Sequence, residues 1–142
     1  MKTVKQLLST KSAQIFSVPA DTSVLNALQV MMEKNISALL VMEEHLLLGI
    51  FTERDYARKI ILHGKSSADT SLSEVMTPHP ITISPDDTLD HCMLLMTDKH
   101  IRHLPVVQNH QLLAMVSIGD VVKFIIEDQK QTISQLESYI NS

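Results

Sequence analysis

Apolar residues follow two spacings along the chain, and together these predict a repeated order of helices and strands. After a short extended stretch at 15–18, apolar side chains recur every three or four residues and predict a helix over 24–34. Two short apolar runs follow, at 38–42 and 46–51, and the polar break between them predicts a hairpin of buried strands. From Thr52 the spacing becomes helical again.

The second half of the chain repeats this order at a constant offset of 65 residues. Residues 34–41 align without a gap with residues 99–106, and Asp55 aligns with Asp120. Such self-similarity indicates two copies of one strand–helix–strand–strand–helix unit. A unit of about 50 residues has little interior to offset its ordering entropy, so we expect the two sheets to pack about a pseudo-two-fold axis. The predicted fold class is α+β, with an added C-terminal helix.

The repeat divides the chain into five expected segments. These are an N-terminal helical lead at 1–14, the first repeat at 15–63, a linker with a short helix at 64–76, the second repeat at 77–128 and a C-terminal helical extension at 129–142. Residues 71–76 resemble residues 3–8, and both are expected to lead as single amphipathic turns into the repeat that follows. The extension carries Ile133, Leu136 and Ile140 on one helical face, and we expect this stripe to pack on a second subunit.

Composition and charge narrow the classes of function. The net charge is −4, with 12 Lys and Arg against 16 Asp and Glu, which opposes binding to nucleic acid or to an anionic membrane. No apolar run approaches the roughly 18 residues of a membrane span, and residues 1–10 lack the apolar stretch of a signal peptide. The single cysteine, Cys92, excludes an internal disulfide and disfavours a thiolate zinc site. We therefore expect a reduced cytoplasmic protein with no metal site.

A hydroxyl residue followed three positions later by an aspartate occurs at the same place in both repeats. Thr52 precedes Asp55, and Ser117 precedes Asp120, where the second hairpin strand meets the next helix. This spacing is typical of a capping box, in which both side chains bond amides at the helix start. A carboxylate in that position can also accept two hydrogen bonds from a ribose diol, while the hydroxyl and the first amides face a phosphate. The two interpretations are compatible.

With these motifs the sequence resembles the tandem CBS-domain family, named after cystathionine β-synthase. The resemblance covers residues 17–126 and rests on GIFTERD at 49–55, SIGD at 117–120, NISALLV at 35–41, HIRHLPV at 100–106 and MTP at 76–78. The sequence is similar in particular to small stand-alone bacterial proteins with one CBS pair and a C-terminal helix. The resemblance implies adenosine-nucleotide binding in clefts between the repeats and dimerisation into a flat disc.

The same resemblance implies roles for individual residues. Ribose contacts map onto Asp55 and Asp120, and hydroxyl contacts onto Thr52 and Ser117. Adenine contacts map onto the first strands and the residues before the hairpins, which are Ser17, Val18, Ile36, Ser37, Ala38, Thr82, Ile83, Ile101, Arg102 and His103, with Pro105 completing the set. The phosphate candidates are Arg54, Arg58, Arg102 and His103. Ala114 replaces a glycine that is frequent in the family, so the two clefts are chemically unequal and need not hold the same ligand.

The sequence contains no Ser/His/Asp set and no phosphate-cradling glycine loop, so we do not expect an enzyme. We expect a regulatory module that binds an adenosine nucleotide, with AMP as first choice and ADP, ATP or NAD as others, and no catalytic cofactor. It would report occupancy through the packing of a homodimer to a regulated protein that the sequence does not identify. The alternatives are a protein-interaction dimer with empty clefts and a nucleotide-using enzyme.

Overall fold

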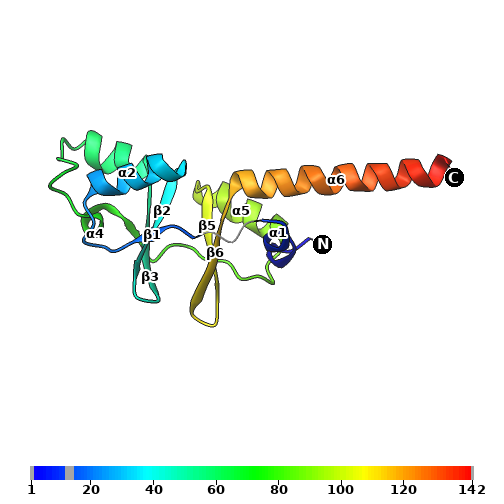
Figure 1. Cartoon of the computed structure of the whole chain (residues 1–142), viewed down its shortest axis with the longest axis horizontal. Coiled ribbons are helices and arrows are strands. Elements are labelled where there is room, and N and C mark those ends of the chain that lie inside the picture. The colour runs from blue at the N-terminus through cyan, green and yellow to red at the C-terminus, as the bar shows by residue number, and fades with distance from the viewer. Residues whose placement is uncertain (1, 12–14, 142) are drawn as a thin grey trace.

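The computed structural model of the chain describes residues 2–11 and 15–141. The first repeat contains β1 (Ser17–Val18), α2 (Val24–Lys34), β2 (Ala38–Glu43), β3 (Leu46–Thr52), α3 (Glu53–Asp55) and the π-helix η1 (Tyr56–Ile61). The second repeat contains α5 (Leu89–Lys99), β5 (His103–Gln108), β6 (Gln111–Ser117) and α6 (Ile118–Asn141). Three short elements complete the chain: α1 (Val4–Thr10), α4 (Leu72–Val75) and β4 (Thr77–Pro78). Figure 1 shows two halves, each with a hairpin beneath helices, and α6 projecting from the second half.

The strand pairing confirms the predicted repeat. The first half has a four-stranded sheet in the order β1-β2-β3-β4, in which β1 is parallel to β2 and β3 is antiparallel to both neighbours. In the second half β5 and β6 form the corresponding hairpin. Ile83 bridges Val106 in parallel, just as Val18 pairs with Val41 in the first half. The α+β class with two copies of one unit and a C-terminal helix is therefore confirmed.

Helices α2 and α5 have matching ends because the same local signals occur in both repeats. The Ser23 hydroxyl accepts a hydrogen bond from the Asn26 N–H, and the Thr88 hydroxyl accepts one from the His91 N–H, each at 3.1 Å. These side chains satisfy amides that the first helical turn leaves without partners. Both helices end at a residue with a φ of 54°, Asn35 or His100, a left-handed conformation that stops the helix.

Three apolar clusters hold the halves and join them. The first half is packed around Phe51 and Leu39, and the second around Leu104 and Val116. A third cluster contains Leu40 and other residues on β2 and β3, with Leu112 and Met115 of β6 packed against it. The two hairpins therefore contact each other through apolar side chains, in agreement with the predicted packing of sheet on sheet.

The short helices α1 and α4 are exchanged between the halves. Val4 and Leu7 of α1 are buried in the core of the second half, whereas Leu72 and Val75 of α4 are buried in the core of the first. Backbone hydrogen bonds show the same exchange. The Val4 N–H donates to the Asp87 carbonyl of the second half, and the Leu72 N–H donates to the Thr22 carbonyl of the first half, both at 2.9 Å. Each short helix thus precedes one repeat in the sequence and packs on the core of the other repeat.

The segments after the two hairpins differ between the repeats. After β3, the single predicted helix is divided into the short α3 and the wider η1. After β6, the predicted repeat helix and the predicted extension form one continuous helix of 24 residues, α6. Across the described residues, α6 included, no helix has the length and apolar character needed to cross a membrane.

Candidate functional site

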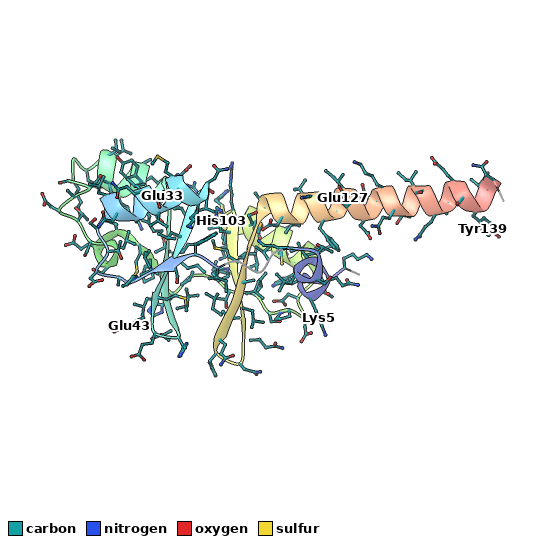
Figure 2. All side chains as sticks on the ribbon, viewed as in Figure 1. Lys5, Glu33, Glu43, His103, Glu127 and Tyr139 are labelled. Carbon is teal, nitrogen blue, oxygen red and sulfur yellow. The ribbon has the colours of Figure 1, made fainter. Side chains whose placement is uncertain are left out.

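A cleft of about 1050 Å³ lies between the two halves, and we call it the interrepeat cleft. Its wall is formed by the end of β3 with α3 and η1, by residues 79–81 after β4, and by the end of α5 with residues 100–103. Figure 2 shows His103 at the junction of the halves. The wall includes these residues that the sequence singled out: Ser37, Thr52, Arg54, Asp55, Arg58, Ile101, Arg102 and His103.

The carboxylate of Asp55 is fixed at one end and faces side chains of the cleft at the other. Its Oδ2 accepts hydrogen bonds from the Thr52 N–H at 3.0 Å and from the Thr52 hydroxyl at 3.2 Å, completing the predicted capping box. Its Oδ1 lies 3.2 Å from Lys59 Nζ and accepts a hydrogen bond from the Thr77 hydroxyl at 3.3 Å. The Asp55 side chain is 12% exposed. One oxygen thus holds the helix start, and the other is directed to groups that line the cleft.

Strand β4 brings Thr77 to Asp55, and Gly49 makes this approach possible. Gly49 pairs with Pro78 across β3 and β4. A Cβ at Gly49 would lie 2.7 Å from Met76 Sδ and 2.8 Å from the Thr77 carbonyl oxygen, closer than atoms can approach. The corresponding position of the second repeat is Ala114, which pairs with Val106 of β5. The glycine that begins the GIFTERD motif therefore has a packing role beside the site.

Cationic side chains outnumber acidic ones on the cleft wall. The acidic residues are Glu53 and Asp55, and the basic residues are Arg54, Arg58, Lys59, Lys99 and Arg102. The histidines on the wall are His79, His100 and His103. Although the whole chain is acidic, this excess of positive charge in a recess attracts anions.

Two polar contacts join the halves across the cleft. The Arg54 guanidinium donates a hydrogen bond to the His100 carbonyl, and Ser37 Oγ lies 3.2 Å from His103 Nε2. Burial lowers the pKa of His103, and the charges of Arg102 and Lys11 lower it further, against the opposing effect of Asp120. His103 is therefore neutral at neutral pH and can either donate to or accept from Ser37.

Asp120, the counterpart of Asp55, has different surroundings and does not line this cleft. Its Oδ2 accepts a hydrogen bond from the Ser117 N–H at 2.9 Å and lies 2.5 Å from Lys11 Nζ. The same ammonium donates to the Met115 carbonyl at 2.6 Å. Burial raises the pKa of Asp120, but the hydrogen bond and charge of Lys11 and the N–H of Ser117 lower it by more. A lysine of this chain thus occupies the carboxylate in the second repeat.

The remaining residues of the predicted set lie outside the wall of this cleft. They are Ser17, Val18, Ile36, Ala38, Thr82, Ile83, Pro105, Ser117 and Asp120. The wall also contains residues that the predicted set lacks, among them Lys59, Thr77 and the 79–81 segment. Lys59 follows Asp55 by one helical turn, a spacing visible in the sequence, whereas Thr77 reaches the site only through the pairing of β4 with β3.

Within residues 2–11 and 15–141 no three His, Cys, Asp or Glu residues gather as metal ligands.

The family model for the CBS domain matches residues 4–62 and 72–127. The chain belongs to the CBS-domain family. The two matched stretches follow the two repeats, each beginning with the short helix that precedes it in sequence. The GIFTERD and SIGD motifs thus lie at equivalent places in two CBS domains, and the interrepeat cleft lies between the members of a CBS pair.

Similar proteins carry the names of CBS-domain or signal-transduction proteins. The mitochondrial CBS domain-containing protein CBSX3 of Arabidopsis thaliana is 41% identical over 125 residues, which are 84% of this chain and 61% of the relative. This chain therefore spans less than two thirds of that relative. The structure of a CBS-domain protein of Burkholderia ambifaria MC40-6, assigned to signal transduction, is 43% identical with a TM-score of 0.87, and the match covers 90% of this chain and 96% of that one.

A second similar structure contains adenosine compounds. The CBS domain pair of protein MJ0100 is 25% identical to this chain, with a TM-score of 0.79 over 90% of this chain and 98% of that one. It was solved in complex with 5′-methylthioadenosine and S-adenosyl-L-methionine. Adenosine compounds thus bind to a CBS pair of the same fold.

Proposed function

We propose that this CBS pair is a non-catalytic regulatory module that binds one adenosine nucleotide in the interrepeat cleft, with Asp55 holding the ribose. The observation that carries the proposal is the Asp55 carboxylate: Oδ2 is fixed by Thr52, while Oδ1 faces the cleft. A ribose diol would replace Thr77 and Lys59 as the partners of Oδ1. Lys59, whose side chain is 40% exposed, would then be free to approach a phosphate.

The charge of the cleft favours ligands that carry phosphate. An anionic nucleotide would be attracted by Arg54, Arg58 and Arg102, whereas the positive sulfonium of S-adenosyl-L-methionine would be repelled. We therefore retain AMP as first choice, with ADP, ATP and NAD as further members of the same class. This chain would differ in that respect from the MJ0100 pair.

Ligand binding would act on the contacts that join the halves. A phosphate beside Arg54 competes with the His100 carbonyl for the guanidinium, so occupancy would alter a bond that crosses the cleft. A ligand shifts such an equilibrium only by its different affinities for the two arrangements. We propose that a homodimer carries this change to a regulated protein, since Leu25, Met32 and Leu94 expose apolar surface on α2 and α5. Buried Cys92 suits the reduced cytoplasmic setting that completes the proposal.

The test is thermal unfolding with AMP, ADP, ATP, NAD, adenosine and S-adenosyl-L-methionine, for the wild-type chain and for Asp55→Asn. At 100 times its dissociation constant, a ligand of the folded state stabilises it by about 2.7 kcal/mol. We expect this stabilisation from a phosphate-bearing member and its loss in Asp55→Asn.

Asp120→Asn is the matched control, because it places the same substitution at the same position of the other repeat. It should retain the ligand-induced stabilisation, measured against its own unliganded form. Loss of binding in Asp120→Asn alone would move the ligand to the other side of the pair. Absence of any response would refute nucleotide binding and favour the protein-interaction dimer.

A further inference from the structure

The outer part of α6 is a helix that extends beyond the body of the protein. The ion pair between Lys2 and Asp128, at 3.1 Å, ties α6 to the N-terminal segment, and every residue from 129 to 141 is exposed. Figure 2 shows the helix continuing from the labelled Glu127 to Tyr139 as a projecting rod. An isolated helix of fewer than about 12–15 residues is marginal in water, so a helical segment of this length needs a packing partner.

Apolar residues form one stripe along this rod, and we call it the α6 seam. Ile126, Ile133, Leu136 and Ile140 have exposed fractions of 47%, 56%, 59% and 79%. With Gln129, they alternate in steps of three and four residues, which is the a/d pattern of a coiled coil. The isoleucines occupy the a positions, and Gln129 and Leu136 occupy the d positions. A helix that remained exposed to solvent on all sides would be polar all round and would carry no such stripe.

We infer that the α6 seam pairs antiparallel with the α6 seam of a second copy of this chain. The charges beside the seam favour the second copy as occupant and set the direction. Lys130 and Glu137 both occupy e positions, on the same flank of the helix. In an antiparallel pair, e positions face each other, so Lys130 of each copy lies beside Glu137 of the other. In a parallel pair, e faces g, where this chain has Ile125 and Thr132, and neither charge finds a partner.

The antiparallel register follows from the same residues. Ile133 of each copy would lie against Leu136 of the other, and the overlap would run over 129–140, roughly 18 Å of helix. Because each body is attached at opposite ends of that overlap, the contact is separate from any contact between the bodies. The inference rests on the homodimer of the proposed function only in that both use a second copy. It would join two chains, or two body-mediated dimers, through their C-terminal helices.

Sedimentation equilibrium of the full chain over a concentration series tests the pairing without any ligand. Leu136→Glu places a charge in the seam and should halve the mass of the largest species. Gln135→Glu, one position away and outside the seam, is the matched control and should leave the mass unchanged. Thermal unfolding of both variants checks that the body stays folded. An unchanged mass in Leu136→Glu, with the wild-type chain monomeric or not, would overturn the inference.

Charge reversal tests the direction. Lys130→Glu and Glu137→Lys should each weaken self-association by about 2- to 30-fold, because one substitution removes both reciprocal ion pairs of the two-fold pair. The double variant should restore the wild-type affinity, and salt should reduce all of these differences. Additive effects without rescue would refute the antiparallel arrangement. These measurements use no nucleotide. They can therefore refute the pairing of α6 while nucleotide binding still holds, and a failure of nucleotide binding leaves the pairing of α6 unaffected.

Discussion

The close approach of β4 to β3 gives the sharpest prediction, because it depends on the absence of one methyl group. In Gly49→Ala, the new Cβ would meet Met76 Sδ at 2.7 Å and the Thr77 carbonyl oxygen at 2.8 Å. The thioether can rotate away, but the carbonyl belongs to the backbone of β4 and can move only if the strand moves. We therefore expect β4 to be displaced from β3.

The expected cost follows from two opposing contributions. Alanine reduces the conformational entropy of the unfolded chain, which stabilises the folded state by about 0.4–1 kcal/mol. Overpacking at a buried contact costs about 1–3 kcal/mol. The net loss in the free energy of unfolding is then roughly 1–2 kcal/mol, equivalent to a fall in Tm of about 2–8 °C. Displacement of Thr77 also removes its 3.3 Å hydrogen bond to Asp55, a bond that the proposed ribose contact would itself replace.

Calorimetric unfolding of Gly49→Ala beside Gly119→Ala measures the effect. At Gly119 the nearest atom to a new Cβ is Ser117 Oγ at 3.6 Å, an ordinary contact, and the residue lies in the first turn of α6. The same substitution should therefore stabilise the chain there by about 0.5–1 kcal/mol, through helix propensity. If Gly49→Ala unfolds at or above the wild-type temperature, the argument from the close approach is refuted.

Two further predictions concern Asp120 and His103, two groups of the second half whose pKa is lowered. In Lys11→Met, the Asp120 carboxylate loses the ammonium that lies 2.5 Å away, so the pKa of this carboxyl should rise towards its usual range. An NMR titration of Asp120 measures this change. An unchanged pKa would contradict the ion pair with Lys11. Because the pKa of His103 is lowered in the folded state, the unfolded chain binds the proton first as the pH falls. Stability should therefore be complete above the unfolded value of about 6.5 and decrease below it, and urea unfolding from pH 8 to 5 should show a smaller decrease for His103→Gln.

Local sequence signals predicted most of the secondary structure. The caps at Ser23 and Thr88 and the capping box at Thr52 act within three residues, so a single sequence displays them. The two hairpins could also be predicted from the sequence, since each consists of two apolar runs around a short polar turn. The offset between the repeats then predicted a common fold, because equal patterns at equal spacing fold alike.

The exchange of α1 and α4 was not predicted, and its physical reason is that both helices carry the same kind of apolar face. Leu7 fits the core of one half and Val75 the core of the other, and nothing within either helix says which. The sequence also does not reveal that Asp55 and Asp120 have different partners. Lys11 contacts Asp120 from 109 positions away, whereas Asp55 has Lys59 one helical turn further on. Of the two contacts, only the local one leaves a pattern in the sequence.

We propose that the linker after β4 lets a ligand in the interrepeat cleft influence the relation between the halves. The pairing of β4 with β3 fixes the linker to the first half, and residues 79–81 then line the cleft. The chain continues from this segment to Ile83, which forms a β-bridge with Val106 of the second half. A ligand that contacted Asp55 and the 79–81 segment would therefore act on a covalent connection between the halves. Because β4 is held at Gly49, a shift of that segment would be transmitted towards Ile83, and so to the half that carries α6.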